Sequence, residues 1–146
     1  MSTFKSTIKT AQDYTNVASR PAADKKLLVA RGSYTLAGTE AANDVIELVK
    51  LPAGAEVLPT QSSFICDASV ATALVAKVGT DSDDDAFSTV TTLTSGGVIG
   101  FTAGTNGVEV VNPVAKTDSY TVQLKLSTST SPTAGKKIGF AISYLV

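Results

Sequence analysis

The stretch Tyr120-Thr121-Val122-Gln123-Leu124-Lys125-Leu126 alternates strictly between apolar and polar side chains. Successive side chains of a β-strand point to opposite faces of a sheet, so this stretch presents one apolar and one polar face. An amphipathic helix would instead repeat its apolar residues at the spacing of a helical turn. The stretch therefore predicts a β-strand that is buried on one face and exposed to solvent on the other.

Similar short, β-branched runs extend in both directions from this stretch. Gly, Pro, Asn, Asp and Ser interrupt them at intervals of about 8 to 12 residues, which is typical of a β-sandwich or barrel. The predicted strands are residues 27–36, 45–51, 56–67, 72–79, 86–93, 98–101, 108–114, 120–126 and 137–146. The last of these is more uniformly apolar than the others, which predicts a central strand covered on both faces and a C-terminus fixed within the sheet.

The predicted secondary structure of two segments depends on their turn residues. Residues 39–50 also fit a helical stripe, but the turn Pro52-Ala53-Gly54-Ala55 that follows them favours a strand from Val45 onward. Asn106-Gly107 is a strong signal for a two-residue hairpin. We therefore predict an all-β fold, a single antiparallel sandwich over residues 25–146.

The composition limits both the core and the function. The 146 residues are 43% hydrophobic, 6% aromatic and 17% charged, with no Trp and no His, so Val, Ile, Leu and Ala must form the core. A net charge of −1 argues against a nucleic-acid partner, because neutralising phosphates requires clustered Lys and Arg. The sequence has neither a membrane-spanning apolar run nor an apolar signal segment at Met1, so we expect synthesis and assembly in a cytoplasm.

Residues 1–24 form a predicted N-terminal arm of different character. Residues 1–31 contain six basic and two acidic side chains, a net charge of +4, whereas the remainder carries −5. Such an arm is either a disordered terminus or a segment that becomes ordered on a partner. Its apolar residues, which include Val17, favour docking. The predicted partner-binding residues are Phe4, Lys5, Ile8, Lys9, Tyr14 and Arg20.

The most chemically suggestive segment is Asp81-Ser82-Asp83-Asp84-Asp85. Its alternate aspartates match the first carboxylates of a calcium loop, but Ala86 replaces the required Gly and Thr92 replaces the bidentate Glu. A solvated hairpin tip is the favoured interpretation. Contact with a basic partner surface and weak Ca²⁺ binding are the alternatives.

Other candidate sites lack the residues that chemistry requires. With no His, a Cys-His pair is impossible, and Cys66 follows the apolar Phe64-Ile65, as expected for a buried thiol. The carboxylates Glu40, Asp44 and Glu47 lie close in sequence, but nothing marks any two of them as a catalytic pair. The tyrosines Tyr34, Tyr120 and Tyr144 suit core or interface packing. We predict no catalytic, cofactor or metal site, and therefore no enzyme.

Two motifs resemble those of small structural proteins of tailed bacteriophages. Residues 44–58 form a strand followed by the turn Leu51-Pro52-Ala53-Gly54-Ala55, and Thr133-Ala134-Gly135-Lys136 introduces the terminal strand. The resemblance covers about residues 31–146. It implies a jelly-roll-like sandwich that acts as a capsid cement or decoration protein in the virion. It also implies a homotrimer seated on the major capsid protein.

Two other classes of function remain open. A carbohydrate-binding or fibre-adhesin module of a phage tail would use the same all-β architecture. It would bind glycans through exposed tyrosines or through calcium at the acidic segment. A small enzyme with an unrecognised site is the third hypothesis.

Overall fold

The structure is a computed structural model that describes residues 26–94, 96–101 and 118–146. None of its helices in these ranges has the length and apolar character needed to cross a membrane. The elements in chain order are β1 (Leu27–Thr35), β2 (Val45–Leu51), β3 (Glu56–Val57), the 3₁₀ helix η1 (Pro59–Gln61), β4 (Ser63–Cys66), β5 (Ala73–Gly79), β6 (Ser88–Thr92), β7 (Gly97–Gly100), β8 (Tyr120–Thr130) and β9 (Lys137–Leu145).

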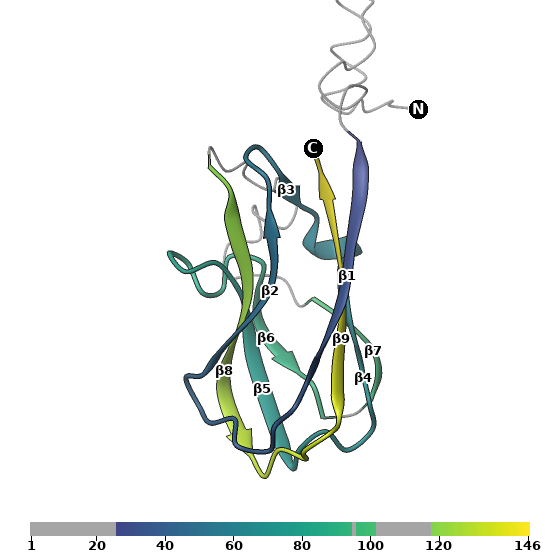
Figure 1. Ribbon diagram of the computed structural model, residues 1–146, viewed down its shortest axis with the longest axis vertical. Coiled ribbons are helices and arrows are strands. Elements are labelled where there is room, and N and C mark those ends of the chain that lie inside the picture. Colours follow the sequence, from purple (N-terminus) through teal and green to yellow (C-terminus); the bar gives the residue numbers. More distant parts are fainter. Residues whose placement is uncertain (1–25, 95, 102–117) are drawn as a thin grey trace, which may run out of the picture.

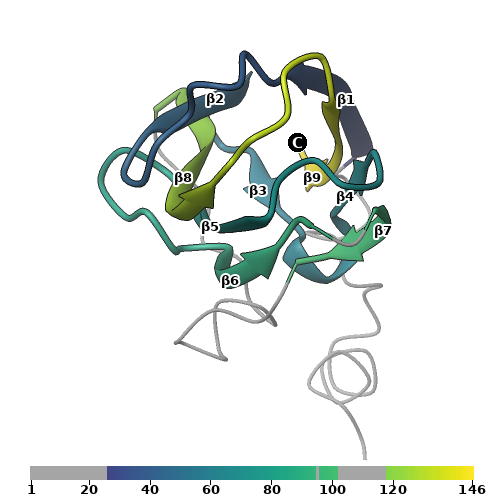
Figure 2. The same ribbon diagram turned by 90° about the horizontal axis from the view of Figure 1, so that it is seen from below.

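The strands form two sheets that face each other. The β9 sheet has the order β1-β9-β4-β7, with β3 pairing a further part of β9, and the β8 sheet has the order β2-β8-β5-β6. All described strand pairs are antiparallel. Figures 1 and 2 show the two sheets as separate layers. The predicted antiparallel β-sandwich is confirmed.

Strand β8 has the predicted alternation. Val122, Leu124 and Leu126 are fully buried against the core, while Gln123 and Lys125 point to the other face and are partly exposed. The strand continues beyond its predicted end at Leu126, because its last residues stay paired with β5 up to Thr130. Backbone pairing thus extends the strand after the apolar alternation has stopped.

Strand β9 occupies the centre of its sheet, as predicted. It pairs with β1 along its whole length and with β4 and β3 on its other edge. Lys26 and Val146 exchange two backbone hydrogen bonds, which fix the C-terminus beside the start of β1 (Figure 1). The prediction that both faces are covered is wrong, because among its outward-facing side chains only Ser143 is buried.

The single strand predicted over residues 56–67 is interrupted. Strands β3 and β4 both lie along β9, but η1 separates them. Pro59 has no backbone N–H for the ladder and begins the 3₁₀ turn. Leu58 still donates a hydrogen bond to the Ser143 carbonyl, so the segment stays against β9 through the interruption.

The other strand predictions have mixed outcomes. The strands predicted at 27–36, 45–51, 72–79, 86–93 and 98–101 agree with β1, β2, β5, β6 and β7 to within two residues. The strand from Val45 is confirmed over its helical alternative. The strand predicted at 108–114 and the Asn106-Gly107 hairpin lie outside the described residues.

The hydrophobic core lies between the two sheets and is built mainly from aliphatic side chains, as predicted. Phe64 of β4 is fully buried and stacks on Phe101, with ring centroids 5.1 Å apart. Phe140 of β9 fits beside Gly32 of β1, where a Cβ would lie 2.6 Å from the Phe140 Cζ atom. A side chain at position 32 would therefore require the Phe140 ring to shift.

Substitutions of the neighbouring residues Phe64 and Ile65 test which face of β4 points into the core. Phe64→Ala should lower the free energy of unfolding by about 3–5 kcal/mol, because it opens a cavity in the core. Ile65→Ala, on the opposite face and 54% exposed, should cost less than about 1 kcal/mol. Urea unfolding of both variants measures this difference, and equal losses would contradict the assignment.

Candidate functional site

The partner-binding residues predicted from the sequence all lie outside the described residues. They are Phe4, Lys5, Ile8, Lys9, Tyr14 and Arg20. The structure therefore places none of them. The candidate sites that can be examined are the acidic loop, the buried polar groups and the outer faces of the two sheets.

The loop between β5 and β6 folds back onto the β8 sheet because Gly79 leaves room for it. A Cβ at residue 79 would lie only 2.1 Å from the Asp83 backbone oxygen. The Thr80 amide donates to that oxygen at 2.7 Å, and the Gln123 side-chain amide donates to the Thr80 carbonyl at 2.9 Å. These contacts bring the acidic residues over Lys77 and Lys125.

The two lysines neutralise part of this loop. Lys125 Nζ lies 2.8 Å from Asp84 Oδ2, and Lys77 Nζ lies 3.3 Å from Asp84 Oδ1 and 3.3 Å from Asp85 Oδ2. The hydrogen bond from Lys125 contributes most to lowering the Asp84 pKa, and the hydrogen bond to Asp84 raises the Lys77 pKa. The prediction of a solvated hairpin tip agrees with the exposed Ser82 but is wrong for Asp84. Asp84 lies beside Lys77 and Lys125, which the pairing of β5 with β8 places next to each other.

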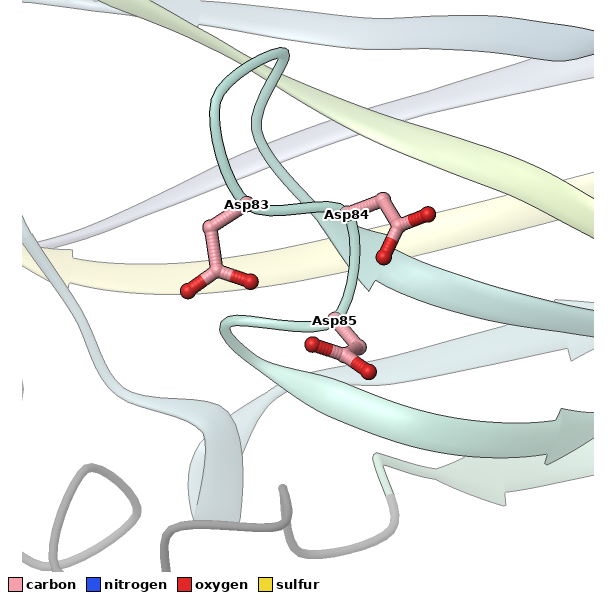
Figure 3. Close-up of side chains that lie close together, drawn as sticks. All are labelled: Asp83, Asp84 and Asp85. Carbon is pink, nitrogen blue, oxygen red and sulfur yellow. The ribbon is translucent and has the colours of Figure 1, made fainter.

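The calcium alternative is not favoured by this arrangement. One carboxylate oxygen from each of Asp83, Asp84 and Asp85 lies within 4.8 Å of the others, and Figure 3 shows the three side chains on consecutive loop positions. Both Asp84 oxygens already contact ammonium groups, however. A cation would have to displace these contacts and approach two positively charged ammonium groups. The loop instead packs on the β8 sheet through ion pairs with Lys77 and Lys125.

Glu40 is a buried carboxylate with a structural role. It is 8% exposed and accepts hydrogen bonds from the Ala37 amide at 2.6 Å, the Gly38 amide at 3.0 Å and the Tyr34 hydroxyl at 2.9 Å. Burial raises its pKa, but these hydrogen bonds together outweigh burial, so the Glu40 pKa is lowered. Glu40 thereby holds the connection between β1 and β2.

The two other carboxylates considered from the sequence, Asp44 and Glu47, do not come together as a pair in the described part of the chain. Asp44 accepts a hydrogen bond from the Ala41 amide, and Glu47 is exposed on β2. Two hollows of about 230 and 280 Å³ lie among the described residues on the outer side of the β8 sheet. The first is lined by Asn43, Lys77, Asp84, Lys125, Leu126 and Ser127, and the second by Glu47, Lys50, Asp81, Ser119, Tyr120, Thr121 and Gln123.

The thiol and the described tyrosines belong to the fold. Cys66 is buried as predicted, and burial raises its pKa to about 11, which leaves it protonated and unreactive near neutral pH. Burial raises the pKa of Tyr120 to about 12, and its hydroxyl donates to the Ala55 carbonyl at 2.8 Å. Tyr34 and Tyr144 are partly buried against the core, so the prediction of packing roles is confirmed.

The β9 sheet has an exposed apolar outer face that the sequence did not predict. We call it the apolar face and define it by Leu27 and Val29 of β1, Ile65 of β4 and Val98 of β7. Their side chains are 54%, 47%, 54% and 74% exposed. The run Leu27-Leu28-Val29 was a signal for it, because it does not alternate, but the exposed side becomes known only from the pairing with β9.

The β8 sheet presents a contrasting outer face. Gln123 and Lys125 alternate with buried side chains on β8, and the register with β5 places Lys77 beside Lys125. The outer face of the β8 sheet therefore carries ion pairs around β5 and β8 with single exposed valines at Val45 and Val90, whereas the apolar face of the β9 sheet carries four exposed aliphatic side chains. Exposed apolar patches of this kind mark interaction surfaces in soluble proteins.

Comparisons with solved structures identify similar folds. A chain in the capsid of Ralstonia phage GP4 has a TM-score of 0.61 and is 21% identical, over 82% of this chain and 84% of that chain. A chain in the capsid asymmetric unit of cyanophage Pam1 has a TM-score of 0.52 and is 20% identical, over 84% and 86% of the two chains. No family model and no curated protein matches the sequence. The likeness shows a shared sandwich fold.

Gly79→Ala tests whether the loop must fold back onto the sheet. The added Cβ meets the backbone oxygen of Asp83, so the variant should lose about 1–3 kcal/mol of unfolding free energy. Gly100→Ala is the matched control, because nothing lies within 4 Å of the Cβ that it adds. Chemical denaturation compares the two variants, and similar stabilities would contradict this role of Gly79.

The lowered Glu40 pKa predicts how stability depends on acid. The folded carboxyl holds its proton less tightly than the unfolded one, so its contribution is full above about pH 4.5 and is lost as the pH falls toward the folded value. Glu40→Gln should cost about 1–3 kcal/mol at pH 7 and flatten this acid dependence. Unfolding at pH 7 and pH 3 measures both effects. If Glu47→Gln flattened the dependence equally, the prediction would fail.

Proposed function

We propose that the chain is a structural protein of a tailed-phage virion that acts as a capsid cement or decoration protein. The carrying observation is the fold, since most of this chain matches most of a chain in each of two phage capsids. The resemblance of residues 44–58 and 133–136 to small phage structural proteins supports the same class independently of the coordinates.

We infer further that the sandwich is a jelly roll. If β3 and β4 count as one interrupted strand, eight strands have the order 1-8-3-6 in the β9 sheet and 2-7-4-5 in the β8 sheet. Jelly rolls are eight-stranded double sheets built from two Greek keys, and they are common in viral capsid domains. The strand order therefore supports the proposed class of protein.

A cement protein works by adding buried interface to a shell, without bond chemistry. The proposed partner is the major capsid protein, and the proposed assembly is a homotrimer formed in the host cytoplasm and retained in the virion. Within the described chain β1, β7, β2 and β6 are edge strands. Packing between subunits would cover such edges, which otherwise promote aggregation. The proposal includes no enzymatic activity, no cofactor and no nucleic-acid partner.

A glycan-binding adhesin is the weaker candidate. It would need exposed aromatic side chains or bound calcium. The described Tyr34 and Tyr120 instead use their hydroxyls within the fold, and Asp84 contacts two lysines. These contacts favour the capsid proposal over the glycan-binding one.

The N-terminal arm is proposed to help attach the protein to the shell. Phe4, Lys5, Ile8, Lys9, Tyr14 and Arg20 supply apolar anchors and positive charge, whereas the rest of the chain is acidic. An arm of opposite charge suits a neighbouring subunit or the capsid surface, because complementary charge guides association.

Removal of residues 1–23 tests the arm and the capsid role together. The truncated protein should keep its circular dichroism spectrum, since every described core side chain comes from residues 34–144. Its occupancy on phage heads that lack the protein should fall at least about tenfold at a fixed protein concentration. Quantitative gel analysis of sedimented heads measures occupancy. Full occupancy by the truncated protein would contradict the role of the arm.

The full-length chain is the reference for the same binding experiment. It should saturate the heads at a fixed copy number relative to the major capsid protein. A full-length chain that binds no heads, or that binds glycans or tail fibres instead, would contradict the capsid proposal itself.

A further inference from the structure

We propose that the apolar face of the β9 sheet is the docking surface for residues 1–25 of a neighbouring copy of this chain. The inference deepens the proposed function, and rests on it, because it names the surface that receives the arm. It is carried by the apolar face, by the composition of the arm and by the direction in which the chain enters β1.

The apolar face has the character of a surface that is covered in the assembled protein. Leu27, Val29, Ile65 and Val98 are each about half exposed or more, and they come from three strands of one sheet. The small β9 residues Gly139 and Ala141 lie on the same face, and so does the exposed Arg31 of β1, which separates Leu27 and Val29 from Ile65 and Val98 along the sheet. An extended chain that crosses the sheet can place large apolar side chains over each of these two aliphatic pairs.

The arm supplies the complementary side chains. Phe4, Ile8, Tyr14 and Val17 are large apolar residues spread along it. The described members of the core come from residues 34–144. The large apolar side chains of the arm are the kind of group that the exposed side chains of the apolar face would bury.

The direction of the chain at Lys26 indicates a neighbouring copy. Lys26 exchanges two backbone hydrogen bonds with Val146, so the β1–β9 ladder is still extended at the last residue of the chain. Strand β1 therefore begins at the end of the sheet where the C-terminus lies (Figure 1), and the arm joins the sandwich at that end. To cover its own face, the arm would first have to reverse direction.

The length of the arm is sufficient for this exchange. Twenty-five residues can span up to about 80 Å when extended, whereas four paired strands are only about 15–20 Å wide. Pro21 also favours an extended backbone at the residue before it. The arm can therefore leave one sandwich and cross the apolar face of the next.

Disulfide trapping between two different full-length variants tests the contact. One variant carries Ile8→Cys in the arm and the other carries Val98→Cys on the apolar face, so only a link between copies can join them. Val90→Cys is the matched control, because Val90 is a 52% exposed valine on the β8 sheet. The native Cys66 is buried and stays in both variants.

Under mild oxidation with copper phenanthroline, the Ile8→Cys and Val98→Cys pair should link at least about tenfold faster than the control pair, because docking raises the effective concentration of the two thiols. Equal rates would contradict the proposal. Faster linking within a single chain that carries both substitutions, with none between chains, would show that the arm covers its own sheet and would also contradict it.

Charge substitutions provide the second readout. Val29→Lys with Val98→Lys places two ammonium groups on the apolar face, while Val45→Lys with Val90→Lys places two on the β8 sheet, at valines that are also about half exposed. Only the first variant should weaken the oligomer, raising its dissociation constant at least about tenfold in sedimentation velocity. An oligomer unaffected by the first variant, or retained after removal of residues 1–25, would overturn the inference.

The two proposals fail in different ways. A protein that exchanges arms but never binds phage heads contradicts the capsid role and leaves the docking surface standing. A protein that occupies heads without linking Ile8→Cys to Val98→Cys contradicts the docking surface alone.

Discussion

The pairing of β9 with β1 is the constraint on which the rest of the β9 sheet depends. Nine consecutive residue pairs join the first described strand to the last, and two more backbone hydrogen bonds join Lys26 to Val146. The other edge of β9 holds β3 and β4, and β4 holds β7. The C-terminal strand must therefore be in place before the sheet is complete. Its register also decides which side chains of β1 point into the core and which form the apolar face.

Much of the fold was predictable because it depends on local alternation. In β8 the apolar side chains Val122, Leu124 and Leu126 mark the buried face from the sequence alone. The break at Pro59 and the fold-back at Gly79 were not predicted, since each depends on what another segment does nearby. Pro59 sits on an edge of β9, and Gly79 faces the backbone of its own loop.

The candidate sites were less predictable than the fold. The buried thiol of Cys66 could be anticipated from its apolar neighbours. The neutralisation of Asp84 could not, because Lys125 lies 41 residues away and comes beside it only through the register of β5 and β8. The apolar face was missed for the same reason. The run Leu27-Leu28-Val29 in β1 does not alternate, so only its pairing with β9 shows which of these side chains lie on the outer face of the sheet.

The two outer faces together suggest how the protein works in a particle. The β8 sheet presents ion pairs and polar side chains that remain stable in water, whereas the β9 sheet presents aliphatic side chains that gain stability when covered. The proposed function therefore depends on surfaces that would join copies of the chain to one another and to a phage shell. The most direct test of the proposed capsid role is a cryo-electron microscopy reconstruction of phage particles produced from a genome that encodes the chain. The account predicts sandwich-shaped density at a fixed copy number on the outside of the head, and such density at the tail or nowhere in the particle would contradict it.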